Sequence, residues 1–421
     1  MLPRILQFGK FYPPDIGGIE SVMQDICEGL NARGLICDVL CSNSARSFAY
    51  DITKSARIYR TASFGKVAST SISPQMISAL SHLIAPYHII HLHLPDPMAN
   101  LALFLLQKKA RGKIIILHWH SDIIKQKYLL RFYKPLQTWL LKRADFIIAT
   151  SPNYIAQSRF LKPFRQKCIS IPIGINAHLL KPPCAHTQHL DFLDKYAHKK
   201  MIFSLGRLAQ NKGFVYLIES MKFLSQEYIL CIGGDGALRN ELKRLIGAAN
   251  LTHRVFLVGA IPREQLAYYY ERCHIFVLPS IQESFGVVLL EAMSFSKPVI
   301  STNLSPSGSA FVNQHGISGL VIPPKNPKAI AQAINDIESR YAHFAKGARE
   351  RFLAHFTQEQ MLDSIIALYK RAYELRKGGG RSEYVALYAP TRYIAAHFCY
   401  AYNILAHATA IHSAQRLTLC A

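Results

Sequence analysis

The chain has 421 residues, which is too long for one ordinary domain and predicts two domains with additional segments. Half of the residues are hydrophobic, so two large cores can form, and the formal net charge of +23 predicts an anionic partner: nucleic acid, an acidic membrane surface or a phosphorylated small molecule. The nine scattered cysteines form no CxxC pair and no Cys/His ligand spacing, which argues against a zinc centre or a disulfide framework and favours a reducing compartment.

The sequence gives no sign of targeting to a membrane or to export. Its N-terminus has only a short apolar stretch, Ile5 to Phe8, which is too short for a secretory signal. No uninterrupted apolar run reaches the roughly 18 residues of a spanning helix. We therefore expect a cytoplasmic protein.

Strand-like apolar segments alternate with helix-like segments in the first part of the chain. One helical stretch, IESVMQDICEGLNARG, ends at Gly34. This alternation predicts βαβ units and a parallel sheet that is covered on both faces by helices. The expected buried strands are RILQFG (4–9), CDVLC (37–41), HIIHLH (88–93), KIIILHWH (113–120), DFIIATS (145–151) and KCISIPIG (167–174).

The same rhythm restarts in the second part of the chain, after a segment with paired prolines, several histidines and no strong period. We expect two doubly wound halves, residues 1–175 and 200–357, joined by a linker at 176–199. Ligands of such sheets bind at the carboxyl ends of the strands, so a cleft between the halves would collect both sets of strand ends. The expected strands of the second half are MIFSLGRL (201–208), YILCIGG (228–234), RVFLVGA (254–260), HIFVLPS (274–280), KPVIST (297–302) and GLVIPP (319–324).

Two segments follow the second half. We expect a C-terminal helix at 358–377 that packs back toward the first domain, and then an atypical tail at 378–421 that is rich in Ala, Tyr and His. The tail is open to four interpretations: an interfacial helix, an oligomer contact, a disordered segment or a fortuitous extension. No role is assigned to it.

Two motifs of the first half lie where strands should end. Gly17 and Gly18, in PPDIGGIESV, fall where the first strand would turn into a helix, and glycines there let backbone N–H groups approach a phosphate or simply make the turn. The spacing is not GxGxxG, so a dinucleotide-binding fingerprint is not supported. HWHSD (118–122) brings His120 and Asp122 to a strand end, where polar groups are good candidates for a site, although a single histidine there can equally be structural.

A basic segment with aromatic residues follows HWHSD. It contains no acidic residue and is divided by Pro135. A basic, aromatic-bearing helix suits an anionic membrane surface, and the alternative is an ordinary surface helix with one buried face. The six basic residues are Lys125, Lys127, Arg131, Lys134, Lys142 and Arg143.

The loop SLGRLAQNKGF (204–214) follows the first strand of the second half and presents Arg207 and Lys212 between glycines. Two fixed cations at a strand end can neutralise a diphosphate leaving group. A solvated basic loop is the alternative, because the chain carries 49 Lys and Arg residues. The glycine cluster CIGGDGALRNEL (231–242) is too weak a signal to assign more than a strand-to-helix turn.

The segment ESFGVVLLEAM begins a helix near Phe285 and Gly286, just after the strand IFVLP. A helix N-terminus offers free N–H groups and partial positive charge to a phosphate. Glu283 precedes this helix and Glu291 lies about two turns into it, so the two carboxylates can reach different parts of one extended ligand. A nucleotide sugar has that layout, because a sugar and a ribose flank its diphosphate and a carboxylate accepts hydrogen bonds from hydroxyl pairs.

Taken in order, GGIE, HWHSD, GRLAQNKG and above all ESFGVVLLEAM, an E-x7-E element, resemble the retaining glycosyltransferases of family 4 over residues 1–375. The resemblance implies the GT-B fold, an α/β architecture of two Rossmann-like domains that face a cleft. Residues 118–154 look most like bacterial enzymes of surface-polysaccharide assembly, including mannosyl- and rhamnosyltransferases that use GDP-sugars. The tail beyond Gly378 departs from this pattern.

The resemblance implies roles for individual residues. Arg207, Lys212 and the amides of Ser284, Phe285 and Gly286 would bind the donor diphosphate, and Gly17 and Gly18 would close on it from the other domain. Glu283 would hold the transferred sugar and Glu291 the ribose. His120 would lie by the donor sugar and the attacking hydroxyl, with Asp122 beside it in the motif.

The expected reaction moves a hexose such as mannose from a nucleoside-diphosphate sugar, with GDP favoured, to a lipid-linked or saccharide acceptor of lipopolysaccharide, O-antigen or exopolysaccharide biosynthesis. We expect no cofactor and no metal, because the chain has no Asp-x-Asp motif and its cations can supply the charge. Front-face attack and double displacement through a covalent intermediate both remain open. If residues 125–143 bind an anionic membrane, the enzyme would be peripheral on its cytoplasmic face.

Two other functions remain open. A nucleotide-sugar epimerase on the same architecture would share the diphosphate site and need no acceptor. A basic, non-enzymatic nucleic-acid-binding protein would explain the charge, but the sequence has no helix-turn-helix, zinc-finger or RNP-type motif.

Overall fold

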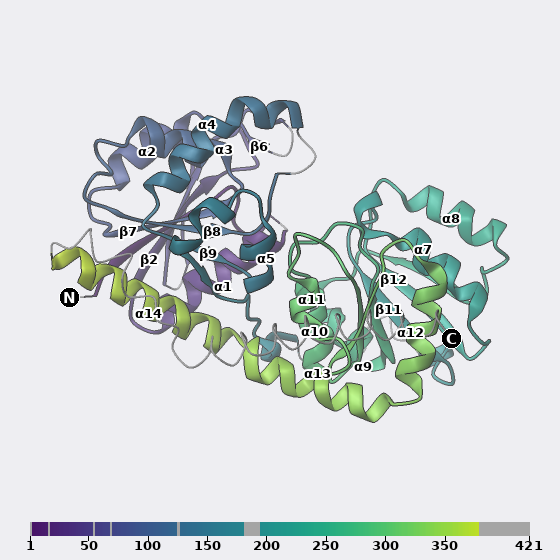
Figure 1. Cartoon of the computed structure of the whole chain (residues 1–421). Coiled ribbons are helices and arrows are strands. Elements are labelled where there is room, and N and C mark those ends of the chain that lie inside the picture. The colour runs from purple at the N-terminus through teal and green to yellow at the C-terminus, as the bar shows by residue number, and fades with distance from the viewer. Residues whose placement is uncertain are drawn as a thin grey trace, which may run out of the picture. The chain divides into compact units, whose positions relative to one another are not determined.

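A computed structural model describes most of the chain (Figure 1). Residues 1–374 form one compact unit, and a second unit, 375–421, begins in the last turn of the C-terminal helix. The described residues are 2–15, 17–53, 55–67, 70–123, 127–180 and 194–378.

The first sheet has eight strands in the order β10-β9-β8-β7-β1-β2-β4-β3. All neighbours are parallel except the edge pair β3 and β4. The chain moves outward from β1 in one direction, through β2 and β4, and then returns to the other side of β1 with β7, so the sheet has a topological switch point between β1 and β7. Its strands are β1 (Arg4–Phe8), β2 (Ile36–Ser42), β3 (Ala49–Ile52), β4 (Arg57–Thr61), β7 (Ile89–Leu94), β8 (Ile114–Trp119), β9 (Phe146–Ala149) and β10 (Cys168–Ser170).

Helices alternate with these strands, and a short hairpin of β5 (Lys66–Val67) and β6 (Thr70–Ser71) stands apart from the sheet. The central strands β7 and β8 are buried along their whole length, as expected for strands that helices cover on both faces. Leu6, Ile90, Leu117 and Ile147 from successive strands share one core with apolar residues of the covering helices. These helices are α1 (Gly18–Ala32), α2 (Gln75–Leu83), α3 (Pro97–Leu105), α4 (Lys127–Arg143) and α5 (Pro152–Gln157).

The second sheet has six parallel strands in the order β13-β12-β11-β14-β15-β16. Numbered within the sheet, this order is 3-2-1-4-5-6, the doubly wound arrangement of a Rossmann fold, with its switch point between β11 and β14. Ile202, Leu230, Val277 and Ile300 contribute to its separate hydrophobic core. The strands are β11 (Lys200–Leu205), β12 (Tyr228–Gly233), β13 (Val255–Gly259), β14 (Ile275–Leu278), β15 (Val299–Thr302) and β16 (Gly319–Ile322).

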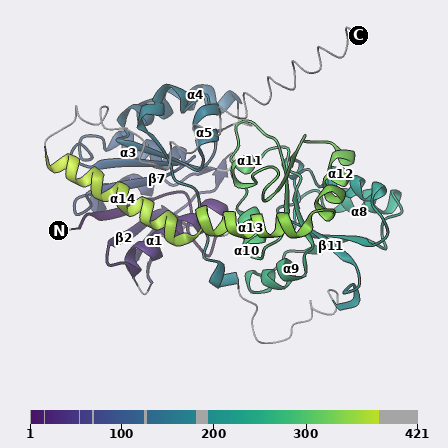
Figure 2. The same cartoon turned by 60° about the horizontal axis from the view of Figure 1, so that its bottom comes forward.

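The C-terminal helix, α14 (Gln358–Lys377), is the longest of the described helices and lies alongside α1 and β2 (Figures 1 and 2). Arg33 of the turn after α1 pairs with Asp363 at 2.7 Å, and the Tyr369 hydroxyl reaches the buried side chains of Gln7 and His91. The remaining helices of the second half are α7 (Phe214–Ser220), α8 (Arg239–Ala248), α9 (Leu266–Arg272), α10 (Val287–Ser294), α11 (Ser309–Val312), α12 (Pro327–Glu338) and α13 (Tyr341–His355).

The prediction of two doubly wound α/β halves is confirmed, and each of the twelve segments expected to be buried strands overlaps one. The exposed edge strand β3 and its neighbour β4 were not predicted. The predicted boundaries at 175, 200 and 357 remain predictions, and the tail after residue 378 and residues 181–193 of the expected linker lie outside the described residues. None of the described helices combines the length and apolarity that a membrane span requires.

Candidate active site

The second sheet brings Lys212 and Glu283 together. The Lys212 Nζ atom lies 2.6 Å from Glu283 Oε2, and the two side chains are only 22% and 15% exposed. Glu283 Oε1 accepts a hydrogen bond from the Ser284 amide at 3.1 Å. A cation and a carboxylate that the chain separates by seventy-one positions are therefore fixed against each other beyond the carboxyl ends of β11 and β14, at the switch point of the sheet.

Backbone contacts between the two loops explain this proximity. The Asn211 carbonyl accepts from the amides of Ile281 and Gln282 at 2.9 and 3.2 Å, so the loop before α7 is joined directly to the loop after β14. Gly213 permits the approach. Its φ of +67° is left-handed, and a Cβ atom there would lie 2.2 Å from the Pro279 carbonyl oxygen.

Arg207 follows β11 in the same loop region and is exposed. Among the described residues it has no hydrogen bond or ion pair. The structure therefore pairs Lys212 with Glu283, whereas Arg207 has no partner among the described residues. The role of Arg207 in binding a diphosphate stays a prediction.

The helix expected near Phe285 is α10, with Gly286 as its N-cap residue at a φ of +87° and no side-chain cap. Within the described part of the chain, the amides of Phe285 and Gly286 donate no hydrogen bond. The Ser284 amide donates to the Glu283 carboxylate, and its predicted contact with a phosphate stays a prediction. The buried Phe285 ring anchors the turn against Phe356, so two free amides and a helix N-terminus are presented beside Glu283.

Glu291 lies on α10, about one and a half turns beyond Gly286. Its Oε2 atom accepts a hydrogen bond of 2.5 Å from the Tyr270 hydroxyl. Burial raises the pKa of the Glu291 carboxyl, and the Tyr270 hydrogen bond and the charge of Arg263 oppose that shift. Tyr270 therefore orients a carboxyl whose other oxygen can accept from a ligand hydroxyl.

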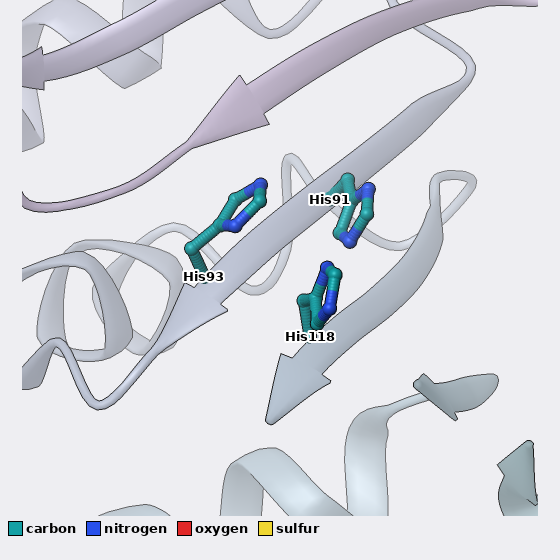
Figure 3. A group of neighbouring side chains, drawn as sticks. All are labelled: His91, His93 and His118. Carbon is teal, nitrogen blue, oxygen red and sulfur yellow. The ribbon is translucent and has the colours of Figure 1, made fainter. Parts of the chain in front are cut away.

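The first sheet contributes neutral imidazoles instead of charges. His91 and His93 project from β7, and His118 projects from the neighbouring strand β8 toward the same side (Figure 3). His120 follows β8, and its ring stacks on those of His118 and His93 at 4.1 and 5.3 Å. Burial lowers the pKa of His120 to about 3 and lowers the pKa values of the other three imidazoles well below their usual range, so all four are uncharged at neutral pH.

The residue types of this cluster suit a transition metal, because nitrogens of His91, His93 and His118 lie within 4.8 Å of one another. The ring planes do not converge, however. His91 and His118 are stacked with 11° between their planes, and one ion cannot lie in the plane of two parallel rings, where the nitrogen lone pairs point. Both nitrogens of His93 already have hydrogen-bond partners. The expectation that the site needs no metal stays a prediction.

The Asp122 carboxylate makes its hydrogen bonds outside the cluster of His91, His93, His118 and His120. It accepts from the Trp119 indole at 2.8 Å and from the Ser158 hydroxyl at 2.8 and 3.0 Å, and the Asp122 amide donates to the Tyr154 hydroxyl. These hydrogen bonds hold the loop that carries His120 in place. The predicted contact of Asp122 with the donor is not tested by this arrangement.

Gly17 and Gly18 lie at the start of α1, where Gly17 is the N-cap residue. A Cβ atom on Gly17 would fall 2.1 Å from Glu20 Oε2, whereas one on Gly18 would meet nothing within 4 Å. The Glu20 carboxylate therefore stands at the helix N-terminus, where an incoming phosphate would have to displace it. Contact of this turn with a donor stays a prediction.

The basic segment forms α4 as expected, with Leu130, Leu140 and Leu141 on its buried face. A cavity of about 440 Å³ is hollowed along its outer side. Phe132 is 82% exposed. Lys125 lies outside the described residues. The cavity is lined by Arg131, Lys134, Pro135, Thr138, Trp139 and Lys142.

Sequence reasoning did not select Gln7, Tyr270 or Tyr369. A signal existed for Gln7, which is the one polar residue inside the apolar run of β1 and is fully buried. The two HxH patterns, 91–93 and 118–120, also predict that these histidines share a sheet face, because strand side chains alternate. The two tyrosines carry no comparable signal, because their partners come from distant segments.

Comparison with known families agrees with this architecture. Residues 16–179 match the family described as Glycosyltransferase Family 4, and residues 187–351 match the one described as Glycosyl transferases group 1. Among solved structures, sucrose-phosphate synthase from Thermosynechococcus elongatus gives a TM-score of 0.72 at 24% identity and covers 88% of this chain and 99% of that one. HepE from Anabaena in complex with UDP gives 0.71 at 19% identity, covering 87% and 100%. These likenesses show the fold.

Two curated relatives extend over most of the chain. The O-antigen chain mannosyltransferase C of Escherichia coli is 30% identical over 377 residues, which cover 88% of this chain and 99% of the relative. The D-rhamnosyltransferase WbpZ of Pseudomonas aeruginosa is 31% identical over 339 residues, covering 79% and 85%. The prediction of a glycosyltransferase is confirmed: the chain belongs to the glycosyltransferase family that comprises these enzymes and is described by the family 4 and group 1 domains.

Proposed function

We propose that this enzyme moves mannose or a related hexose from a GDP-activated donor to a lipid-linked or saccharide acceptor in the assembly of a bacterial surface polysaccharide, with retention of anomeric configuration. The names of the mannosyl- and rhamnosyltransferase relatives support the class of sugar and the pathway. The cationic and amide-rich edge of the second sheet supports a diphosphate donor.

One observation carries the proposal: Lys212 and Glu283 are paired at 2.6 Å next to the unoccupied amides of Phe285 and Gly286. A diphosphate at these amides would lie within reach of the Lys212 ammonium, and the transferred sugar would lie beside the Glu283 carboxylate. Cleavage of the sugar–phosphate bond develops negative charge on the leaving diphosphate. Lys212, the start of α10 and the exposed guanidinium of Arg207 would stabilise that charge.

The two carboxylates divide the donor between them. Glu283 would accept hydrogen bonds from hydroxyls of the transferred hexose, and Glu291, oriented by Tyr270, would accept from the ribose. The attacking hydroxyl belongs to the acceptor, near His120. Since Lys212, Arg207 and the helix N-terminus provide positive charge at the leaving group, we propose that the reaction needs no metal ion and no cofactor.

A panel of nucleotide sugars tests the donor. We expect GDP-mannose to raise the melting temperature more than UDP-, ADP- or dTDP-sugars, because at equal concentration the ligand that binds the native state more tightly stabilises it more. Transfer to a lipid-linked oligosaccharide, followed by NMR of the product's anomeric centre, tests the acceptor and retention. A protein stabilised only by UDP-sugars, or an inverted product, overturns the corresponding part of the proposal.

The same transfer assay distinguishes a transferase from a nucleotide-sugar epimerase. An epimerase would release a changed sugar and nucleotide from the donor alone, whereas a transferase consumes donor at a useful rate only with acceptor present. We expect donor turnover to rise at least about tenfold when acceptor is added, because a closed site excludes water until the acceptor binds.

The outer side of α4 supports a membrane-bound acceptor. Arg131, Lys134 and Lys142 line a cavity together with Trp139, and Phe132 on the same helix is exposed to solvent. Cations beside aromatic rings suit the phosphates and the interface of an anionic bilayer. We expect flotation with vesicles that contain phosphatidylglycerol and not with phosphatidylcholine alone. Equal binding to both, or none, would defeat this part of the proposal.

A further inference from the structure

A continuous chain of buried hydrogen bonds links His120 to the C-terminal helix. His120 Nε2 lies 3.0 Å from His93 Nδ1, and His93 Nε2 lies 2.7 Å from Gln7 Oε1. Gln7 Nε2 then donates to the Tyr369 hydroxyl at 3.2 Å, and that hydroxyl lies 2.5 Å from His91 Nδ1. Every member lies on one face of the first sheet or on α14 and is shielded from water.

The donors and acceptors of this chain allow only one proton arrangement once the Gln7 amide is oriented. The Gln7 oxygen accepts, so His93 must carry its proton on Nε2 and present a lone pair at Nδ1. His120 must then donate from Nε2, which leaves its Nδ1 atom unprotonated. At the other end, the Tyr369 hydroxyl accepts from Gln7 and donates to His91.

The surroundings of Gln7 support that orientation of its amide. Its nitrogen lies 3.2 Å from the Tyr369 hydroxyl, and its oxygen lies 2.7 Å from His93 Nε2. With Tyr369 at the nitrogen, the oxygen faces His93.

We propose that Gln7 and Tyr369 are positioning residues, which act through His93 to fix His120 as the tautomer that presents its unprotonated Nδ1 to the reaction centre. The described residues offer no partner to that atom. It can accept a hydrogen bond from a hydroxyl of the donor sugar or of the acceptor, which the opposite tautomer could not do. This inference rests on the proposed function, because it assigns the hydroxyl-bearing ligand to the His120 side of the site.

The test combines nitrogen NMR with kinetics. In protein labelled with ¹⁵N-histidine, the His120 signals, assigned with His120→Ala, should show a protonated Nε2 and an unprotonated Nδ1 in the wild type. Tyr369→Phe and Gln7→Leu should populate the other tautomer. We expect kcat to fall about threefold in Tyr369→Phe and about tenfold in Gln7→Leu, with the KM for the nucleotide sugar unchanged.

A double variant distinguishes an effect carried by the hydrogen bonds from Tyr369 to His120 from independent packing defects. If Tyr369 acts only through Gln7, the double variant Gln7→Leu/Tyr369→Phe should be no slower than Gln7→Leu alone, whereas independent packing defects should multiply. Tyr373→Phe is the matched control, because it removes a hydroxyl one turn further along α14, from a ring that makes an edge-to-face contact with His88. We expect wild-type kcat and an unchanged His120 tautomer in that control.

The outcomes distinguish this inference from the proposed function. If both single variants fold and keep full kcat and the wild-type His120 tautomer, Gln7 and Tyr369 are not positioning residues. Sugar transfer by the wild type would be unaffected by that result. A wild-type protein that transfers no sugar from any nucleotide donor overturns the proposed function, and the NMR measurement still decides the tautomer. Variants that melt far below the wild type are compared at a temperature where near-ultraviolet circular dichroism shows them folded.

Discussion

The two sheets carry different kinds of polar groups at the carboxyl ends of their strands. The first presents uncharged imidazoles from regular strand positions, joined by hydrogen bonds into the interior. The second presents an ammonium, a carboxylate and free amides from loops that depend on left-handed glycines, Gly213 and Gly286. Strands hold neutral side chains in fixed register, whereas glycine turns let charged groups and backbone amides approach one point.

In the proposed reaction, this difference matches the charge of the group that each edge would bind. A neutral hydroxyl is recognised by hydrogen bonds, for which the position and tautomer of an imidazole decide the outcome. A diphosphate that gains charge during the reaction needs cations and dipoles that are already in place. Charges in the buried row of the first sheet would be costly, and histidine avoids that cost by remaining neutral.

The largest expected effect comes from breaking the charged edge. Lys212→Ala and Glu283→Ala should each lower kcat roughly a hundred- to thousandfold, because in the proposed reaction each removes a group that would face the leaving diphosphate or the sugar. Circular dichroism and transfer assays with saturating donor measure fold and rate separately. Near-normal turnover in either variant would count heavily against the charged edge as the reaction centre.

The same sheet offers a matched control. Lys200 Nζ pairs with Glu338 Oε1 at 2.7 Å, a distance close to that of the Lys212 pair, but Lys200 begins β11 and so lies at the amino edge of the sheet. Lys200→Ala should leave kcat unchanged and should cost at most about 1 kcal/mol of stability, since the pair is partly exposed. Equal losses of activity from both lysines would mean that the variants disturb the sheet and do not report on the site.

The next effect tests the neutral edge through pH. The pKa values of His91, His93, His118 and His120 are lower in the folded protein than the ordinary value near 6.5, so the unfolded chain binds protons first as the pH falls. Their contribution to stability is complete above that value and is lost as the pH falls below it. We expect the free energy of unfolding to drop by about 2 kcal/mol between pH 7.5 and 6 in urea titrations.

Two carboxyls reduce this drop, because burial raises the pKa values of Asp25 and Asp96 to about 6 and their protonation favours the folded state. His118→Leu isolates the imidazoles. Both His118 nitrogens are buried and lack a hydrogen-bond partner among the described residues, so the variant should fold and should reduce the histidine part of the slope by about a quarter. A stability that is flat over this range, or a slope that His118→Leu leaves unchanged, would mean that the row is charged in the native state.

The two edges also differ in what the sequence could predict. Local patterns sufficed for Lys212 and Glu283, because each sits in a loop directly after a recognisable strand and parallel strands end at one edge. The pairing of Lys212 with Glu283 and the hydrogen bond from the Ser284 amide to Glu283 could be seen only in the structure. For the first edge, His120 could be selected from its motif, but its hydrogen-bonded neighbours come from β1 and from α14, and Gln7 and Tyr369 are separated by 362 positions. Contacts over that distance depend on the tertiary packing of a helix and leave no local period.

The smallest expected effect concerns the glycine on which the charged edge depends. Gly286→Ala should lower the free energy of unfolding by about 1–2 kcal/mol, because alanine is disfavoured at a φ of +87° and its Cβ would lie 2.9 Å from Leu278 Cδ2. Gly247, inside α8, has open space around the same atom, so Gly247→Ala should stabilise the protein by about 0.5–1 kcal/mol. Urea titrations of both variants measure the contrast. Opposite signs are required if left-handed backbone geometry sets the start of α10, and a neutral Gly286→Ala variant would show that the turn can form without it.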